Sequence, residues 1–418
     1  MAAEPVTAEA APAHRAAERA ARSSYGRLLA LLAAATGDVA TAEDTLSAAF
    51  EQALRTWPTQ GVPGNPEGWL LTVARNRQRD VWGSAAHRRC APLAAAVLAG
   101  ADAVSPLDEL DPDALPDRSL ELLFVCAHPA IDPAVRTPLM LQTVLGYDAS
   151  RIAALFGVPA AAMAQRLVRA KRRIRDTRIP FAVPSRARLA ERLPPVLEAV
   201  YACYAIDLSD EAAPLAVGLA TAFPDRSEAW GLAALITLSR ARRRGAAPST
   251  YLPLEDQDPA TWDAALIAEG ESYLRRATPG PLGRFQCEAA VHAVHCARAR
   301  TGATDWSALR TLYAALQVLA PTAGAGVAHA VVIGRTDGPV AGLAELDRLA
   351  GETDVERFQP WWAARGDLLV RAGRTADAAA ALRRAADLTT DPAHADHLRH
   401  RIDGLGVRAR TAATAGTG

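Results

Sequence analysis

Aromatic residues are scarce in this chain of 418 residues, at 5%, although hydrophobic residues as a whole make up 50%. Small aliphatic side chains, alanine above all, must therefore fill most of the interior. Alanine loses no side-chain entropy in a helix, so a chain dominated by alanine and arginine favours helices over strands. We expect an all-α fold. At roughly 100–200 residues per domain, the length predicts two or three domains.

Cysteine is also rare, and its pattern argues against a disulfide framework or a zinc module. The number of cysteines is odd, they are widely scattered, and no CxxC pair occurs. A reducing compartment fits this pattern best. The five cysteines are Cys90, Cys126, Cys203, Cys287 and Cys296.

Long hydrophobic runs are missing. No stretch approaches the roughly 18–20 apolar residues that cross a bilayer. The N-terminus, MAAEPVTAEAAPAHRAAERAARSS, contains acids and lacks the continuous apolar stretch of a signal peptide. We therefore expect a soluble, cytoplasmic protein that has no membrane partner.

Net charge is absent too, because 46 basic residues balance 46 acidic ones. Any contact with nucleic acid must therefore rest on local basic surfaces. Phosphate-binding glycine loops and nucleophile-elbow motifs are not found either. We expect no enzyme activity, no catalytic residue and no cofactor.

Breaker residues and composition divide the chain into segments. The acidic segment carries six acids and no basic residue, which marks an exposed tether; the alternative is that it competes with DNA for the basic segments on either side. The expected segments are a disordered N-terminus (1–15), a domain of three helices (16–90), the acidic linker (91–117), a helix-turn-helix domain (118–180), a helical domain (181–405) and a disordered tail (406–418).

About ten helical segments with short breaks follow residue 180, which predicts a helical solenoid. The last pair resembles the tetratricopeptide repeat of about 34 residues, in which small side chains let two antiparallel helices touch. The residues that match its fourth, eighth, twentieth, twenty-fourth and twenty-seventh positions are Trp362, Gly366, Ala378, Leu382 and Ala385.

The segment from residue 147 to residue 175 reads YDASRIAALFGVPAAAMAQRLVRAKRRIR. We expect a short helix to end near Gly157, because glycine readily adopts the backbone conformation that ends a helix. A longer helix begins at Ala160, just after a proline, which suits the start of a helix. This is the spacing of a helix-turn-helix. We expect the buried residues to be Ile152, Ala153 and Leu155 in the first helix and Met163, Leu167, Ala170 and Ile174 in the second.

Basic and polar residues of the longer helix lie largely off this buried stripe. They can contact base edges near the start of the helix and phosphates further along. A solvated basic face on a structural helix is the alternative. The candidate DNA-binding residues here are Gln165, Arg166, Arg169, Lys171, Arg172 and Arg173.

The segment 68–89, GWLLTVARNRQRDVWGSAAHRR, combines arginines with tryptophans. Aromatic rings stack on single-stranded bases and guanidinium groups hold phosphates, which suits the opening of a DNA duplex. Each tryptophan could equally be an anchor of the core. The candidate DNA-binding residues here are Trp69, Arg75, Asn76, Arg79, Trp82, Arg88 and Arg89.

Four segments resemble, in order, parts of extracytoplasmic-function sigma factors of the sigma-70 family: AEDTLSAAFEQALRTWP, NPEGWLLTVARNRQRD, CAHPA and VPAAAMAQRLVRAKRRIR. LEDQDPATWDAALIAEG, TDWSALRTLYAAL and DGPVAGLAELDRLA resemble the group with a large C-terminal tetratricopeptide-like extension. The resemblance covers roughly residues 22–405. It implies a sigma region 2 domain, a helix-turn-helix region 4 domain and a helical tail.

The resemblance also implies partners and roles. Core RNA polymerase and promoter DNA are the expected partners, and the tail would hold a protein or peptide. Residues 42–54 would face the clamp helix of the polymerase, residues 69–82 would open the −10 strand and residues 160–175 would read the −35 element. The candidate polymerase-binding residues are Glu43, Asp44, Phe50 and Glu51.

Departures from the family pattern leave other functions open. Ser47-Ala48 stands where Gln-Glu is usual, Arg151 replaces a glutamate, and the segment 201–205 lacks an Asn-Glu-Gly run. One alternative is a divergent sigma-like scaffold whose tail binds a protein or small molecule and which no longer initiates transcription. Another is an enzyme pocket in the tail around Asp256, Trp262, His292 and His295. The cluster Cys287, His292, His295 and Cys296 lacks a clean second ligand pair, so we expect no metal.

Overall fold

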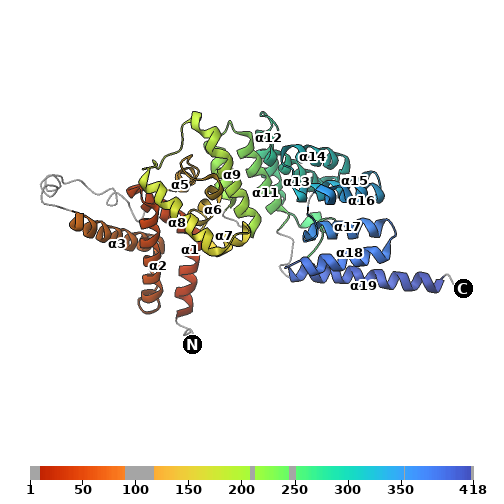
Figure 1. The fold of residues 1–418 in the computed structure, drawn as a ribbon, viewed down its shortest axis with the longest axis horizontal. Coiled ribbons are helices and arrows are strands. Elements are labelled where there is room, and N and C mark those ends of the chain that lie inside the picture. The colour runs from red at the N-terminus through yellow and green to blue at the C-terminus, as the bar shows by residue number, and fades with distance from the viewer. Residues whose placement is uncertain (1–9, 90–116, 208–211, 244–250, 353, 416–418) are drawn as a thin grey trace. The chain divides into compact units, whose positions relative to one another are not determined.

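The computed structural model describes residues 10–89, 117–207, 212–243, 251–352 and 354–415 (Figure 1). Within these residues every regular element is a helix, which confirms the all-α fold class. The chain forms two compact units, Met1–Gly218 and Leu219–Gly418. The domain boundary that we expected after residue 180 therefore falls inside the first unit. Among the described residues, no helix combines the length and apolar content needed to cross a bilayer.

The first unit begins with three long helices that pack on one another. Asp38 caps the second of them, because its carboxylate accepts a hydrogen bond from the N–H of Thr41 (3.1 Å). The indole rings of Trp57 and Trp69 meet edge to face at 5.5 Å, which joins the second helix to the third. The three helices are α1 (Ala10–Thr36), α2 (Val39–Gln60) and α3 (Pro66–Arg89).

Shorter helices complete the first unit. Helix α9 packs on α5 and α6, and α8 contacts α2, α6 and α7. The core of this part is mostly aliphatic, with Leu122, Leu123 and Leu139 fully buried, and the aromatic ring of Phe124 is fully buried as well. These helices are α5 (Ser119–Cys126), α6 (Pro133–Thr143), α7 (Ala149–Leu155), α8 (Ala160–Asp176) and α9 (Arg186–Asp207), and α10 (Ala212–Ala222) crosses the boundary between the units.

Both ends of the chain are more helical than we expected. Helix α1 begins at Ala10, so residues 10–15 are not disordered, and α19 runs to Ala415, so residues 406–415 are helical as well. Ala13 is buried, which explains why the first turns of α1 form. Residues 1–9, 90–116 and 416–418, which include nearly all of the predicted acidic linker, lie outside the described residues.

The second unit is a stack of helices in which neighbours in sequence pack on one another, as a helical solenoid requires (Figure 1). The tetratricopeptide likeness of its last pairs stays a prediction. Its elements are α11 (Ser227–Ala241), the 3-10 helix η1 (Pro259–Thr261), α12 (Ala264–Ala277), α13 (Arg284–Thr301), α14 (Trp306–Leu319), α15 (Ala323–Thr336), α16 (Pro339–Glu352), α17 (Gln359–Arg371), α18 (Thr375–Leu388) and α19 (Pro392–Ala415).

Glycine sets the distance between α15 and α16. A Cβ atom on Gly342 would lie 2.8 Å from the carbonyl oxygen of Ala330 and 2.8 Å from the Cα of Gly334. We expect Gly342→Ala to lower the free energy of unfolding by about 1–3 kcal/mol, because backbone must move to admit the methyl group. Urea unfolding followed by circular dichroism measures this change.

Gly351→Ala is the matched control in the same helix, because nothing lies within 4 Å of a Cβ built there. Alanine should stabilise that exposed position by about 0.5–1 kcal/mol. Equal effects at both glycines would show that the contact between α15 and α16 is loose.

Candidate nucleic-acid interface

The turn between α7 and α8 follows from local residues. Asp148 caps α7, since its carboxylate accepts a hydrogen bond from the N–H of Arg151 (2.9 Å). Gly157 then adopts a φ of +63°, a conformation that glycine allows without steric cost, and Pro159 precedes the first turn of α8. The sequence-predicted pair of helices joined by a glycine-proline turn is therefore present.

Burial along α8 follows the expected stripe of Met163, Leu167, Ala170 and Ile174. The prediction for α7 was wrong at Leu155, which is 50% exposed, whereas Ile152 and Ala153 are buried. Leu155 is the last residue of α7 and lies about 60° around the helix from Ile152, so helical periodicity does not explain its exposure.

Most candidate DNA-binding residues of α8 are exposed, and Lys171 is the exception. Its side chain is buried and forms an ion pair with Glu43 of α2. Lys171 lies four residues after Leu167, so it shares the buried face instead of the basic one. The exposed candidates are Gln165, Arg166, Arg169, Arg172 and Arg173.

The Glu43–Lys171 ion pair involves two of the predicted site residues. Lys171 was expected to contact DNA and Glu43 to contact the polymerase, yet in this arrangement they bind each other. Asp38 and Arg175 approach in the same place, at 3.8 Å. Two ion pairs, Glu43–Lys171 and Asp38–Arg175, therefore join α2 to α8. Neither pair can be inferred from the sequence of one helix alone.

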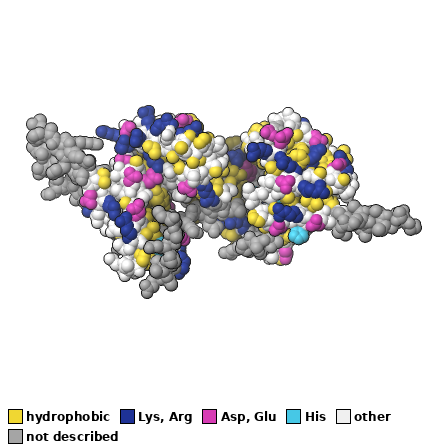
Figure 2. Space-filling model, turned by 60° about the horizontal axis from the view of Figure 1, so that its bottom comes forward, with side chains coloured by type: hydrophobic (Ala, Val, Ile, Leu, Met, Phe, Trp, Pro, Cys, Tyr) yellow, Lys and Arg dark blue, Asp and Glu magenta, His cyan; other side chains and the backbone are white. Residues whose placement is uncertain are grey.

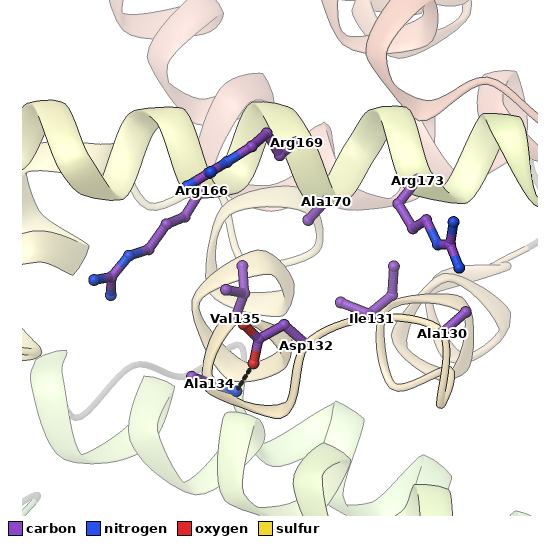
Figure 3. A pocket seen from close by; sticks show the side chains of 9 residues that line it. All are labelled: Ala130, Ile131, Asp132, Ala134, Val135, Arg166, Arg169, Ala170 and Arg173. Carbon is purple, nitrogen blue, oxygen red and sulfur yellow. Dashed lines mark hydrogen bonds between the residues drawn. The ribbon is translucent and has the colours of Figure 1, made fainter.

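A cavity of about 460 Å³ lies between α8 and the segment 130–135 that leads into α6. Figure 3 shows Arg166 and Arg173 extending from α8 toward this segment on either side of Ala170. The floor is apolar, with Ile131 and Val135. Asp132 caps α6, because its carboxylate accepts a hydrogen bond from the N–H of Ala134 (3.0 Å). Guanidinium groups around an apolar floor suit an anionic group such as a phosphate.

Only some of the candidate DNA-binding residues on α3 are exposed to solvent. Asn76 and Arg79 are exposed, while Arg75 is half-buried. Trp69 is half-buried against Trp57, so its ring anchors α3 to α2. The backbone of Trp82, Arg88 and Arg89 belongs to α3, but their side chains lie outside the described residues.

On α2, Asp44 and Glu51 are exposed, and Glu51 pairs with Arg55 at 3.0 Å. Phe50 is half-buried and its ring stacks on Tyr25 at 6.3 Å.

Tyr25 of α1 contacts Phe50 of α2, and the sequence alone did not predict this contact. Burial and the nearby charge of Glu43 raise the pKa of its phenol, and Ser47, one of the departures from the family pattern, forms a hydrogen bond with it. Arg151, a second departure, places its guanidinium 5.1 Å from the centroid of the ring of Tyr147.

On the face of each unit that Figure 2 shows, lysine and arginine are interspersed with acidic and hydrophobic side chains. This mixture agrees with a net charge of zero. Nucleic-acid binding must therefore depend on local sets of arginines such as the one on α8.

Among the described residues of the second unit, the cysteine and histidine side chains do not come together as a set of metal ligands. The thiol of Cys287 donates to the carbonyl of Leu312 (3.2 Å) and that of Cys296 to the carbonyl of Leu238 (3.7 Å). Burial raises the pKa of each thiol to about 11, so both stay protonated at neutral pH. Within the described residues, no three His, Cys, Asp or Glu side chains gather as metal ligands.

Comparisons with known proteins match this architecture in parts. Residues 21–88 match sigma-70 region 2, and residues 192–278 match a family of unknown function (DUF6596). An uncharacterized protein of Rhizobium meliloti (strain 1021) is 34% identical over 392 residues, which is 89% of this chain and 92% of that protein.

A probable ECF RNA polymerase sigma factor, SigI of Mycobacterium tuberculosis, is 32% identical over 158 residues. This match covers 37% of the present chain and 53% of the mycobacterial protein. No solved structure matches the chain.

Proposed function

We propose that the chain, which belongs to the same family as the Rhizobium meliloti protein and carries a sigma-70 region 2, binds core RNA polymerase and directs it to promoters. It would recognise −10 and −35 DNA and open the duplex there. The similarity to SigI of Mycobacterium tuberculosis, a probable ECF RNA polymerase sigma factor, supports the same proposal.

The observation that carries the proposal is the set of exposed guanidiniums on α8, behind a glycine-proline turn and in the same unit as region 2. Arg166, Arg169 and Arg173 also line the cavity beside α6. Guanidiniums can contact guanine bases, which gives sequence specificity, and phosphates, which position the helix on the duplex. Helix α8 would therefore read the −35 element.

The remaining roles would be divided between α3 and α2. Asn76 and Arg79 on the exposed side of α3 would hold the opened −10 strand, with phosphates on the guanidinium. Asp44 and Glu51 on α2 would meet the polymerase, because they are exposed and acidic.

A second candidate function is a sigma-like scaffold that no longer initiates transcription and whose helical tail binds a protein or small molecule. The Glu43–Lys171 ion pair favours it, because the pair occupies one residue expected for the polymerase and one expected for DNA. Ser47 favours it as well, since its hydroxyl bonds Tyr25 where a partner-facing group is usual.

Run-off transcription with purified core polymerase separates the two functions. The full-length chain should yield discrete transcripts from genomic DNA fragments, and the Arg169→Ala, Arg172→Ala double variant should reduce their yield at least tenfold. The matched control is the Arg348→Ala, Arg383→Ala double variant, which removes two exposed arginines of the second unit. DNA binding without transcripts would support the scaffold.

A further inference from the structure

The second unit contains a cavity of about 300 Å³ formed by α13, α14, α15 and the segment that precedes η1. Its lining combines apolar side chains, among them Trp306, Leu309 and Val332, with the polar side chains of His295, Arg298 and Tyr313 and the carboxylate of Glu255. This volume lies at the lower end of the roughly 300–1,000 Å³ that small-molecule sites occupy. A mostly apolar lining with a small number of polar groups is the usual composition of such sites.

Arg298 brings a positive charge into this cavity. Its guanidinium donates to the carbonyl oxygens of Leu254 (2.8 Å) and Gln257, and it lies 5.1 Å from the ring centroid of Trp262. These hydrogen-bond acceptors are neutral, so the contacts orient Arg298 without neutralising it. They also hold the segment before η1 in place as part of the wall.

Two further arginines lie near the site, although neither lines it. The guanidinium of Arg335 lies 5.0 Å from the ring centroid of Trp306, and ion pairs with Asp367 and with Glu255, a residue of the cavity lining, balance its charge. Arg242 contacts the imidazole of His292. Charges placed close to a cavity in the interior act on a ligand with little screening by water.

The histidine and the tyrosine supply neutral hydrogen-bonding groups. Burial, together with Arg242 and Arg298, lowers the pKa of His295 to about 4, so its imidazole is uncharged at neutral pH. Burial raises the pKa of Tyr313 to about 12, so its phenol keeps its proton. Both can bond an anion beside Arg298 without adding a charge of their own.

We propose that this cavity binds a small organic anion, a carboxylate or a phosphate monoester with an apolar or aromatic body. The anionic group would lie between Arg298, His295 and Tyr313, and the body would lie against Trp306, Leu309 and Val332. An aliphatic or aromatic body fits against these apolar side chains, and a charge-assisted hydrogen bond to the anionic group fixes the orientation of the ligand. The site lies wholly in the second unit and does not depend on the proposed role in transcription.

Isothermal titration calorimetry of the purified full-length chain, without polymerase or DNA, tests this proposal. The probes are phenyl phosphate, benzoate and the neutral benzyl alcohol. We expect saturable binding of at least one anion, at least tenfold tighter than that of benzyl alcohol and weakened by added KCl. Binding of phenyl phosphate alone assigns the site to phosphates, and binding of benzoate alone assigns it to carboxylates.

Two variants locate the binding. Arg298→Met should weaken the anion at least tenfold while Arg298→Lys retains part of the affinity, and Ala328→Phe should abolish binding by filling the cavity. Ala328→Phe decides the question if Arg298→Met fails to fold by circular dichroism. The control Arg348→Met changes an exposed arginine of α16 and should leave affinity unchanged. The absence of anion binding to the wild-type chain, or equal binding in Ala328→Phe, would overturn the proposal.

Discussion

Replacing Arg169 and Arg172 together by alanine should weaken binding to duplex DNA about a hundredfold, because each guanidinium contact contributes about 1–3 kcal/mol. Both side chains are exposed on α8, so the substitutions remove charge without disturbing the buried stripe. Each lost phosphate contact also reduces the slope of log affinity against log salt by about one. The slope should therefore fall by up to about two.

Fluorescence anisotropy with labelled duplex DNA, over a series of KCl concentrations, measures both quantities. The Arg348→Ala, Arg383→Ala control lowers the net charge of the chain by the same amount but changes residues of the second unit. Affinity equal to wild type in the α8 variant, or an equal loss in the control, would remove α8 as the DNA-reading helix.

Glu43→Ala is expected to lower the free energy of unfolding by about 3 kcal/mol, because it leaves the buried ammonium of Lys171 without its carboxylate. The Lys171 side chain is 8% exposed and that of Glu43 is 20% exposed, so solvent replaces the lost partner poorly. Urea unfolding of the full-length chain measures the change. Hydrogen exchange along α2 and α8 should become faster, since the ion pair joins these two helices.

Two further variants separate this effect from a simple loss of charge. Glu51→Ala on the same helix removes a carboxylate whose partner Arg55 is exposed, so it should cost no more than about 0.5 kcal/mol. Glu43→Leu combined with Lys171→Leu should recover much of the stability, because neither charge is then desolvated. A loss of stability in the double variant equal to that of Glu43→Ala would show that shape, and not charge, sustains the contact.

Local residues predicted the helices of the first unit well. The glycine at 157 and the spacing from Met163 to Ile174 are short-range signals, and each is in place in the structure. The ends of the chain were predicted less well, because Ala/Pro-rich composition suggested disorder where Ala13 is in fact buried. Burial against distant helices is not visible in the composition of a terminal segment.

The candidate site was predictable only where it depends on one helix. The exposure of Arg166, Arg169 and Arg173 follows from a period of 3.6 residues, because the apolar residues of α8 define the opposite face. Lys171 looked like another member of the basic set. Its burial depends on Glu43, which lies 128 positions away in the chain.

The sequence by itself determined the helical class, the turn before α8 and the stripe that separates its buried face from its arginines, because these depend on side chains within a few turns of one another. Tertiary structure alone decided which charged residues bind each other instead of a partner. It also decided that Arg298, His295, Tyr313 and Trp306 surround one cavity. Such sets form where helices from separate parts of the chain pack together, and no local spacing records which side chains then meet.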